Sequence, residues 1–566
     1  MMKHIVRASL LLLSAALPLG AAAFDIGSPN NPGRQVSVNG SVQVDGLVPE
    51  TTDSRTYKEK VLGNAYANVG LFNQYIDAGL RLEYLEHPMP AFYDSPGFKG
   101  WGIGNFYVTG KYKGFQLTAG DIYEQFGSGL ILRTYEDRAL GIDNSIRGGR
   151  LKVDALKGFH LTLLGGVQRR YWDWTTRCRV YGADLEWDIQ EHIPALSRHG
   201  IVWTLGASWV MKRERYSEKD DSIRTPLPVE VDGKFGYYNL NLPSYVNSFD
   251  FRTHFYKGNV DVLAEFAYKH PDPTADNNYT FSRGTALLLS ATYSKRGISA
   301  QIQAKRSEDM SFRTRRTMTD ITSFINYLPP FAYQHTYALA SMYPYATQYA
   351  PGEWAFQGNF AFNIKRKTKL RLNLSYIRGI EREGDWKKVD DTMYGKDAVK
   401  TSFFGTGPLY YQDFNIQLDQ KVTRAFSFNA MYMFQRYNKT AIEGEGGTIN
   451  AHIAVLEAKV KCSSKVTLRA EAQYLATKQD KGDWVYGLVE VSVLPYLMIG
   501  ASDEWNVGNP NGNKEHFYMF NVTGNYRNNR LMLGYGRTRE GFNCSGGVCR
   551  FVPETRGFQL SYSYNF

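Results

Sequence analysis

Charged side chains of both signs crowd one segment of the sequence, residues 120–150. Such side chains can line or narrow an aqueous lumen and set its charge selectivity. The candidates for this role are Glu124, Arg133, Glu136, Asp137, Arg138, Arg147 and Arg150. The alternative is an ion-pair lattice that braces the protein and passes no solute. The sequence leaves these two interpretations open.

A second segment, residues 324–354, is too long and too aromatic to be a simple connecting loop. It can form a second constriction or present a surface to a partner protein, glycan or substrate. A self-packed cap over the mouth of a barrel is the alternative. The candidate contact residues are Tyr327, Phe331, Tyr333, Tyr337, Tyr343 and Tyr345. A basic cluster lies just before the segment: Arg313, Arg315 and Arg316. Near the outer leaflet it would bind lipopolysaccharide phosphates. The alternative is a solvated charged loop.

Other chemistry finds little support in the sequence. The histidines are scattered and none lies in a recognisable catalytic motif, so we expect no enzyme. The basic residues form no stripe, although the net charge is +11, so nucleic acid is not an expected partner. Cys544 and Cys549 flank a glycine-containing loop, and we predict a disulfide between them; Cys178 and Cys462 are predicted to be free. We expect no metal and no cofactor.

Strict alternation of apolar and polar residues indicates the elements that carry these segments. In the strand predicted at residues 369–376, leucines and Tyr376 alternate with Lys369, Arg371, Asn373 and Ser375. The same period of two recurs almost from end to end. One face of such strands suits lipid and the other suits water. Many of the strands end in a tyrosine, which is typical of aromatic girdles at bilayer interfaces.

The connections between these strands alternate between short and long. Short basic turns, such as residues 110–114 and 365–368, alternate with long segments near residues 46–62, 87–100, 212–245, 306–351, 378–408 and 538–555. Bacterial outer-membrane barrels have short periplasmic turns and long external loops. We therefore predict an all-β fold, a large antiparallel transmembrane barrel with an even number of strands, about 24.

The two ends of the chain fit this prediction. Residues 1–23 read as a signal peptide for export, with a basic start, an apolar stretch and small residues at the cleavage site. Residues 24–34 are a short periplasmic extension, too short for a separate plug domain, and residues 35–566 are the barrel. The last strand should pair with the strand near residues 36–44. Its alternating residues resemble the signal read by the barrel-assembly machinery: Phe558, Leu560, Tyr562, Tyr564 and Phe566.

Three stretches are similar to an uncharacterised family of Bacteroidetes-type outer-membrane barrels, a domain of unknown function. They are residues 121–149, 334–340 and 343–347. The resemblance implies the fold and an outer-membrane location in a Gram-negative bacterium, and it assigns no activity.

We predict a porin-like channel for small polar solutes, anions among them. The alternative is a non-conducting accessory barrel of an envelope, secretion or surface-glycan assembly. The expected partners are outer-membrane lipid and lipopolysaccharide, the barrel-assembly machinery and an envelope protein.

Overall fold

The computed structural model describes residues 24–26 and 35–566, except 53–56, 58, 87–95, 175, 216–228, 232, 238–239, 241, 320, 384–399 and 546–547. The predicted signal peptide lies outside the described residues, as do parts of the long segments predicted near 87–100, 212–245 and 378–408. Among the described residues, no helix is long and apolar enough to cross a membrane.

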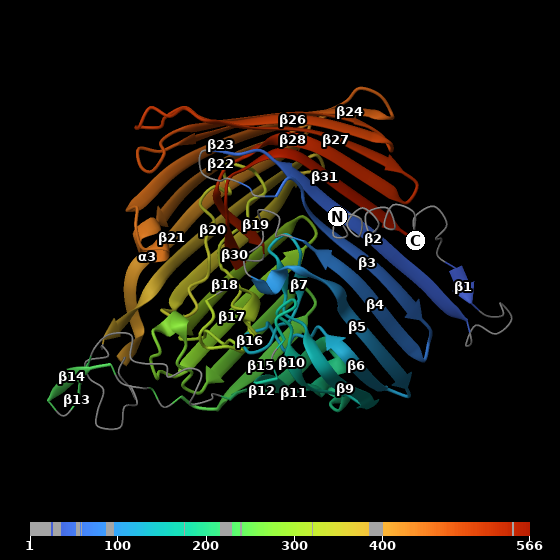
Figure 1. Cartoon of the computed structure of the whole chain (residues 1–566), viewed down its shortest axis with the longest axis vertical. Helices are drawn as coiled ribbons and strands as arrows, with labels where there is room; N and C mark the ends of the chain where they lie inside the picture. The colour runs from blue at the N-terminus through green and yellow to red at the C-terminus, as the bar shows by residue number, and fades with distance from the viewer. Residues whose placement is uncertain are drawn as a thin grey trace.

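One antiparallel sheet of 25 strands dominates the structure (Figure 1). Because β1 (Phe24–Ile26) pairs only with β2, the other 24 strands form the ring. The ring comprises β2 (Val36–Pro49), β3 (Leu62–Phe72), β4 (Ile76–Leu85), β5 (Gly100–Tyr112), β6 (Phe115–Ile122), β9 (Ile146–Leu156), β10 (Phe159–Gln168), β11 (Cys178–Asp188), β12 (Ile201–Glu214), β15 (Tyr245–Lys257), β16 (Val260–Lys269), β17 (Gly284–Lys295), β18 (Ile298–Glu308), β19 (Glu353–Lys365), β20 (Thr368–Glu383), β21 (Lys400–Lys421), β22 (Phe426–Asn438), β23 (Thr448–Lys461), β24 (Val466–Ala476), β25 (Trp484–Val493), β26 (Leu497–Asn506), β27 (His516–Tyr526), β28 (Asn529–Thr538) and β31 (Thr555–Asn565).

The barrel closes where the last strand meets the first strand of the ring. β31 pairs antiparallel with β2, from Ser41 opposite Asn565 to Pro49 opposite Gly557. Closure leaves no unpaired edge among the ring strands, which a bilayer requires of any spanning sheet. The predicted fold class, the 24 strands and the pairing of the two terminal strands are confirmed.

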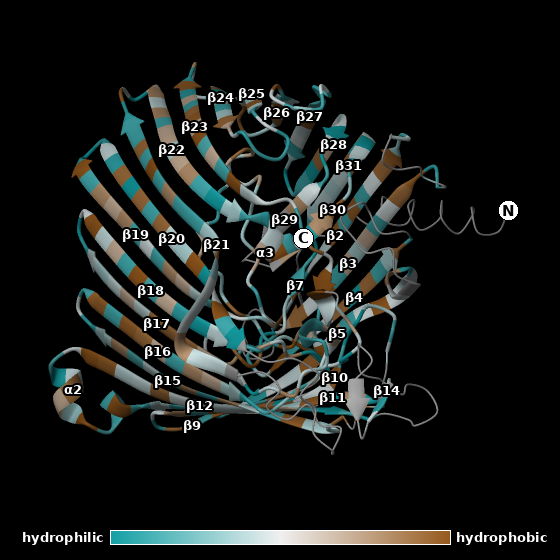
Figure 2. Ribbon diagram, turned by 90° about the vertical axis from the view of Figure 1, so that its left-hand side faces the viewer, coloured by the Kyte–Doolittle hydropathy of each residue, from teal (hydrophilic) through white to brown (hydrophobic). Residues whose placement is uncertain are grey.

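Most residues that face outward are apolar and most that face inward are polar, apart from buried apolar residues on the inner face such as Val210 on β12 and Ile453 on β23. In β20, Leu374 is 45% exposed on the outer face, whereas its neighbours Asn373 and Ser375 are 3% and 2% exposed inside. Figure 2 shows this alternation as brown and teal bands along the strands. An apolar exterior over a polar interior is the inverse of a soluble protein, and it is the arrangement of an outer-membrane barrel.

The two mouths of the barrel differ. Short connections such as Lys113–Gly114 and Arg366–Lys367 gather at one end, which we call the turn mouth; the longest of them, between β11 and β12, holds η4 (Ile189–Glu191) and α2 (Pro194–Arg198). The long connections gather at the other end, the loop mouth. They contain η3 (Pro96–Phe98), β7 (Glu136–Asp137), β8 (Ile142–Asp143), β13 (Val229–Val231), β14 (Lys234–Gly236), η5 (Ala275–Asn277), η6 (Ile321–Ser323), α3 (Lys439–Glu443), β29 (Gly541–Ser545) and β30 (Val548–Val552).

Candidate functional site

Two of the long connections turn back into the barrel and fill its lumen. They are residues 123–145, between β6 and β9, and residues 309–352, between β18 and β19; together we call them the loop plug. Figure 1 shows them as cyan and yellow-green segments inside the ring of strands. The segments carry apolar runs, and Leu130, Ile131 and Leu132 are fully buried in a cluster with Met310 and Ile325. Burial of these side chains drives the two loops together.

Backbone hydrogen bonds join the two segments of the plug. The Arg133 amide donates to the Ile325 carbonyl over 2.8 Å, and the Tyr327 amide donates to the Gly129 carbonyl over 2.8 Å. The Asn326 side chain adds bonds to the carbonyls of Leu130 and Met310. The plug is therefore one body made from two loops and not a separate domain.

Three lysines of the barrel wall hold the longer segment by its backbone. Lys212 on β12, Lys269 on β16 and Lys305 on β18 are each at most 1% exposed. Their ammonium groups donate to the carbonyls of Arg313, Ser311 and Pro329 over 2.7, 2.6 and 2.7 Å. An ammonium charge is costly to bury unless it is compensated. Two of these lysines have a carboxylate within ion-pair distance, Asp272 for Lys212 and Glu353 for Lys305.

The far end of the longer segment crosses to the opposite wall. The Tyr337 hydroxyl donates to Glu457 on β23 over 3.2 Å, and the Leu339 amide donates to Gln473 on β24 over 2.9 Å. Gln435 on β22 donates to the Tyr343 carbonyl over 2.7 Å. The segment thus contacts wall strands from β12 to β24, and the plug spans the lumen.

Four of the predicted charged residues lie in two groups of ion pairs. Glu124 pairs with Arg150 at 2.9 Å and with Lys152 at 2.8 Å. Glu136 pairs with Arg138 at 2.5 Å, and Arg138 also donates to Gln43 on β2.

The three other predicted charged residues contact groups outside the predicted set. Arg147 pairs with Asp121 at 2.9 Å. Asp137 accepts from the Leu140 amide. Arg133 has its guanidinium between the rings of Tyr135 and Tyr327, 4.6 and 3.9 Å from their centroids.

The predicted aromatic contact residues all lie in the plug. Tyr327 stacks on Arg133, and Phe331 is buried 5.5 Å from the Lys305 ammonium. The Tyr333 amide donates to Ser375 on β20 over 3.3 Å, and Tyr343 donates to Asp480 over 3.0 Å. Tyr345 is buried and donates to Glu353. Burial raises the pKa of the Tyr345 phenol well above its usual value, and the Glu353 charge adds to this effect, so the hydroxyl stays a donor.

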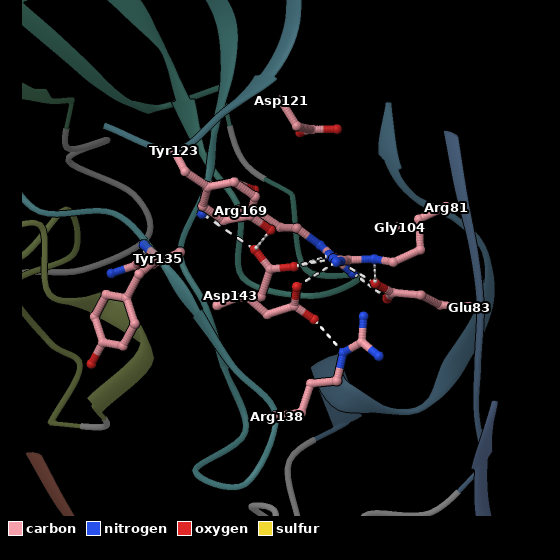
Figure 3. A network of polar contacts seen from close by, with 12 residues as sticks. Arg81, Glu83, Gly104, Asp121, Tyr123, Tyr135, Arg138, Asp143 and Arg169 are labelled. Atoms are coloured by element: carbon pink, nitrogen blue, oxygen red, sulfur yellow. Dashed lines mark hydrogen bonds and ion pairs between the residues drawn. The ribbon is translucent and has the colours of Figure 1, made fainter. Parts of the chain in front are cut away.

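A network of ion pairs joins the plug to the wall at β4 (Figure 3). Arg81 pairs with Glu83, Glu136 and Asp143 at 2.6, 2.6 and 2.5 Å. Arg169 pairs with Glu83 and Asp143 at 2.6 and 2.5 Å. With Arg138 included, three positive charges meet three negative ones. We call these six residues the β4 network.

Sequence reasoning missed four members of this network and the three wall lysines. Arg81 and Glu83 occupy inward positions of an alternating strand, where any polar residue fits the pattern. A buried wall charge has the same sequence signature as a hydrated one, so only the partner supplied by a distant loop distinguishes them.

The expectation for the basic cluster at residues 313–316 was wrong in two of its three positions. Arg313 is 3% exposed and pairs with Asp276 at 2.5 Å. Arg316 is fully buried beside Asp272. These two guanidinium groups do not reach an outer leaflet, because acidic residues of the β16–β17 loop compensate their charge inside the plug.

The cysteines lie at two separate places. Cys549 is disulfide-bonded, and the β29–β30 register sets it opposite Cys544. The Cys549 sulfur lies 3.8 Å from the Tyr345 carbonyl, so this hairpin contacts the plug. Cys178 and Cys462 are free. Within the described part of the chain, no group of three or more His, Cys, Asp or Glu residues is arranged to hold a metal ion.

A family model covers residues 2–566 of this sequence, and its description is a family of unknown function, DUF6029. The chain belongs to this family. Comparison with curated proteins found no match. The predicted Bacteroidetes origin stays a prediction.

Solved structures similar to this chain include OccAB3, the siderophore receptor PirA and the outer membrane transporter YddB. OccAB3 of Acinetobacter baumannii is 7% identical, with 94% of this chain and 99% of that chain covered and a TM-score of 0.34. The siderophore receptor PirA of Pseudomonas aeruginosa is 8% identical, with 94% and 80% covered and a TM-score of 0.41. The transporter YddB of Escherichia coli is 9% identical, with 96% and 87% covered and a TM-score of 0.37.

One glycine gives a direct test of the β4 network. A methyl group on Gly104 of β5 would overlap the Glu83 carboxylate, which Arg81 and Arg169 hold in place. We expect Gly104→Ala to destabilise the barrel by about 1–3 kcal/mol, as overpacking usually does. The measurement is the temperature at which the purified protein loses its compact mobility in detergent gels. Gly110→Ala on the same strand is the matched control, because its methyl group would meet nothing within 4 Å; an equal loss in both variants would contradict the expectation.

Proposed function

We propose that this DUF6029 protein is an outer-membrane channel for small polar solutes, anions among them, and that the loop plug closes its lumen at rest. The observation that carries the proposal is the attachment of the plug. Hydrogen bonds and ion pairs to polar wall residues hold it, together with a buried apolar cluster that includes Val210 and Ile453 of the wall. Water can replace the polar contacts when a loop moves. The polar inner face of the ring would then line the open path.

The ends of the crossing segment lie close together, which suggests where the plug opens. The Thr347 hydroxyl donates to the Leu328 carbonyl over 3.3 Å, and the Leu328 amide donates to the Tyr349 hydroxyl over 3.1 Å. Residues 330–346, which we call the plug tip, therefore leave and return at one place. The tip can be replaced by a short linker while the contacts of Lys212, Lys269 and Lys305 with the rest of the plug are kept.

The test is conductance in planar bilayers. We expect the wild-type protein to be silent or to open rarely, and a variant with Gly-Ser-Gly-Ser in place of residues 330–346 to give large, long-lived steps. A lumen that a loop had blocked would pass ions freely once the loop is removed. If the deletion variant folds, as judged by its compact mobility in gels, and is still silent, the channel proposal is wrong.

The plug also favours a second function, a non-conducting accessory barrel in an envelope, secretion or surface-glycan assembly. A barrel closed by buried ion pairs can serve as an anchor for a partner. Extraction in mild detergent followed by mass spectrometry of the intact complex distinguishes the two functions: an accessory barrel should carry a stoichiometric partner, and a lone chain counts against it.

The location and biogenesis that we propose follow from the barrel. The chain would be exported by residues 1–23 and inserted by the barrel-assembly machinery, which would read the apolar face of β31. It would then contact outer-membrane lipid and the lipopolysaccharide of a Gram-negative bacterium. A truncation that removes residues 557–566 should abolish insertion, as read by protease sensitivity in membrane fractions.

A further inference from the structure

A polar cavity of about 550 Å³ lies on the inner wall near the turn mouth. Strands β19 to β23 and the turn between β19 and β20 form it, and Tyr337 of the plug tip contributes to its lining. Seven of the lining residues are basic and two are acidic. The basic ones are Lys365, Arg366, Lys367, Lys369, Arg371, Lys421 and Lys459.

The two carboxylates in the cavity are already paired. Asp419 is bound by Arg371, and Glu457 pairs with Lys459 at 2.7 Å. None of the ion pairs among the described residues involves Lys365, Lys369 or Lys421. In the described part of the chain, no carboxylate lies within ion-pair distance of these three ammonium groups.

This positive charge is local and is not explained by the net positive charge of the whole chain. A second cavity of about 510 Å³ on the neighbouring wall includes Gly127 and Ser128 of the plug in its lining. It contains four carboxylates and one arginine, with His160 and His254 as its other titratable groups. The same lumen therefore has one acidic and one basic recess, and an anion would be directed to the recess at β19–β23.

We propose that the basic cavity binds a soluble oligoanion with two or more separated phosphate or carboxylate groups. Its volume lies within the usual range of small-ligand sites, roughly 300–1,000 Å³. Because adjacent strands are about 4.8 Å apart, β19 to β23 spread the charges over roughly 19 Å. A single phosphate cannot contact such a row. Amides and hydroxyls in the lining, such as those of Gln420 and Thr368, add hydrogen bonds.

The inference deepens the proposed channel function by naming its solute class. Lysine is a flexible point charge that suits phosphate and carboxylate oxygens without demanding one fixed geometry. A solute held here would sit at the turn-mouth side of the plug tip, beside Tyr337.

The experiment is calorimetric titration of the full-length protein in neutral detergent with sodium tripolyphosphate at low ionic strength. We compare the wild type with K365Q/K369Q/K421Q and with K113Q/K257Q/K295Q, which removes three exposed turn lysines outside the cavity. The expected result is a loss of affinity of at least roughly tenfold in the first variant and under about threefold in the second.

Two outcomes of the titration in detergent overturn the proposal. One is no binding by the wild type, and the other is an equal loss in both variants, which would mean that diffuse net charge attracts the probe. A third arm repeats the titration in nanodiscs of neutral or anionic lipid. If the cavity lysines affect only stabilisation by anionic lipid and not tripolyphosphate binding, the site serves lipid headgroups and the proposal is also wrong. Tripolyphosphate binding is measured without any conductance. A failure of the channel test and a failure of the binding test can therefore be told apart.

Discussion

Replacing Lys305 with methionine is expected to loosen the loop plug by about 3–5 kcal/mol, the usual cost of leaving a buried charge unpaired. Lys305 is fully buried, and its ammonium group lies 2.7 Å from both Glu353 and the Pro329 carbonyl. Methionine retains the length of the side chain without its charge. The Glu353 carboxylate would then keep only neutral donors, the Gln348 amide and the Tyr345 hydroxyl.

Hydrogen exchange of the intact protein measures this loss. Protection of peptides from residues 325–352 should fall by more than about a hundredfold, since each 1.4 kcal/mol is a factor of ten. Bilayer recordings of the same variant should show openings that the wild type lacks.

The double variant K305M/E353Q shows whether the charge itself is responsible. Removing both partners of a buried pair is often nearly neutral, so we expect most of the protection to return. Lys295→Met, at an exposed turn position of β17, should change neither protection nor conductance. A double variant as loose as K305M alone would show that the lysine acts through its packing and not through its pairing with Glu353.

Most of the fold could be predicted from the sequence because a membrane barrel is governed by a local rule. Lipid on one side and water on the other impose the same alternation on every strand, so residues 369–376 reveal their faces without knowledge of their neighbours. Short turns and long loops then fix which end of each strand faces which mouth. Even the closing pair, β2 with β31, follows from the chain termini and an even number of strands.

The interior of the lumen does not follow a local rule. The position of Lys305 on β18 predicts only that it points inward, and its burial depends on Pro329 and Glu353. Arg316 resembles a solvated loop arginine in the sequence, but Asp272, 44 residues earlier, makes its burial tolerable. The crowding of charges at residues 120–150 did indicate a segment with unusual packing. Which charges pair depended on Arg81 and Arg169, far from that segment in the sequence.

Asp143→Asn is expected to have an equally large effect on the shorter segment of the plug. Asp143 is 2% exposed and lies between Arg81 and Arg169, 2.5 Å from each. It also accepts from the Tyr123 hydroxyl over 3.0 Å. An amide in its place removes one of three negative charges from the β4 network and turns an NH2 group toward donors. We expect a loss of about 3–5 kcal/mol and the loss of hydrogen-exchange protection in residues 123–145.

Asp261→Asn is the matched control for this variant, because Asp261 is 43% exposed and its partner is His254. Exposed pairs contribute about 1 kcal/mol or less, so protection should hardly change. Combining D143N with K305M then tests how the plug opens. The bonds between Arg133 and Ile325 and between Tyr327 and Gly129 join the two segments. If they move as one body, the losses of protection will not add; additive losses would mean that each loop leaves the lumen independently.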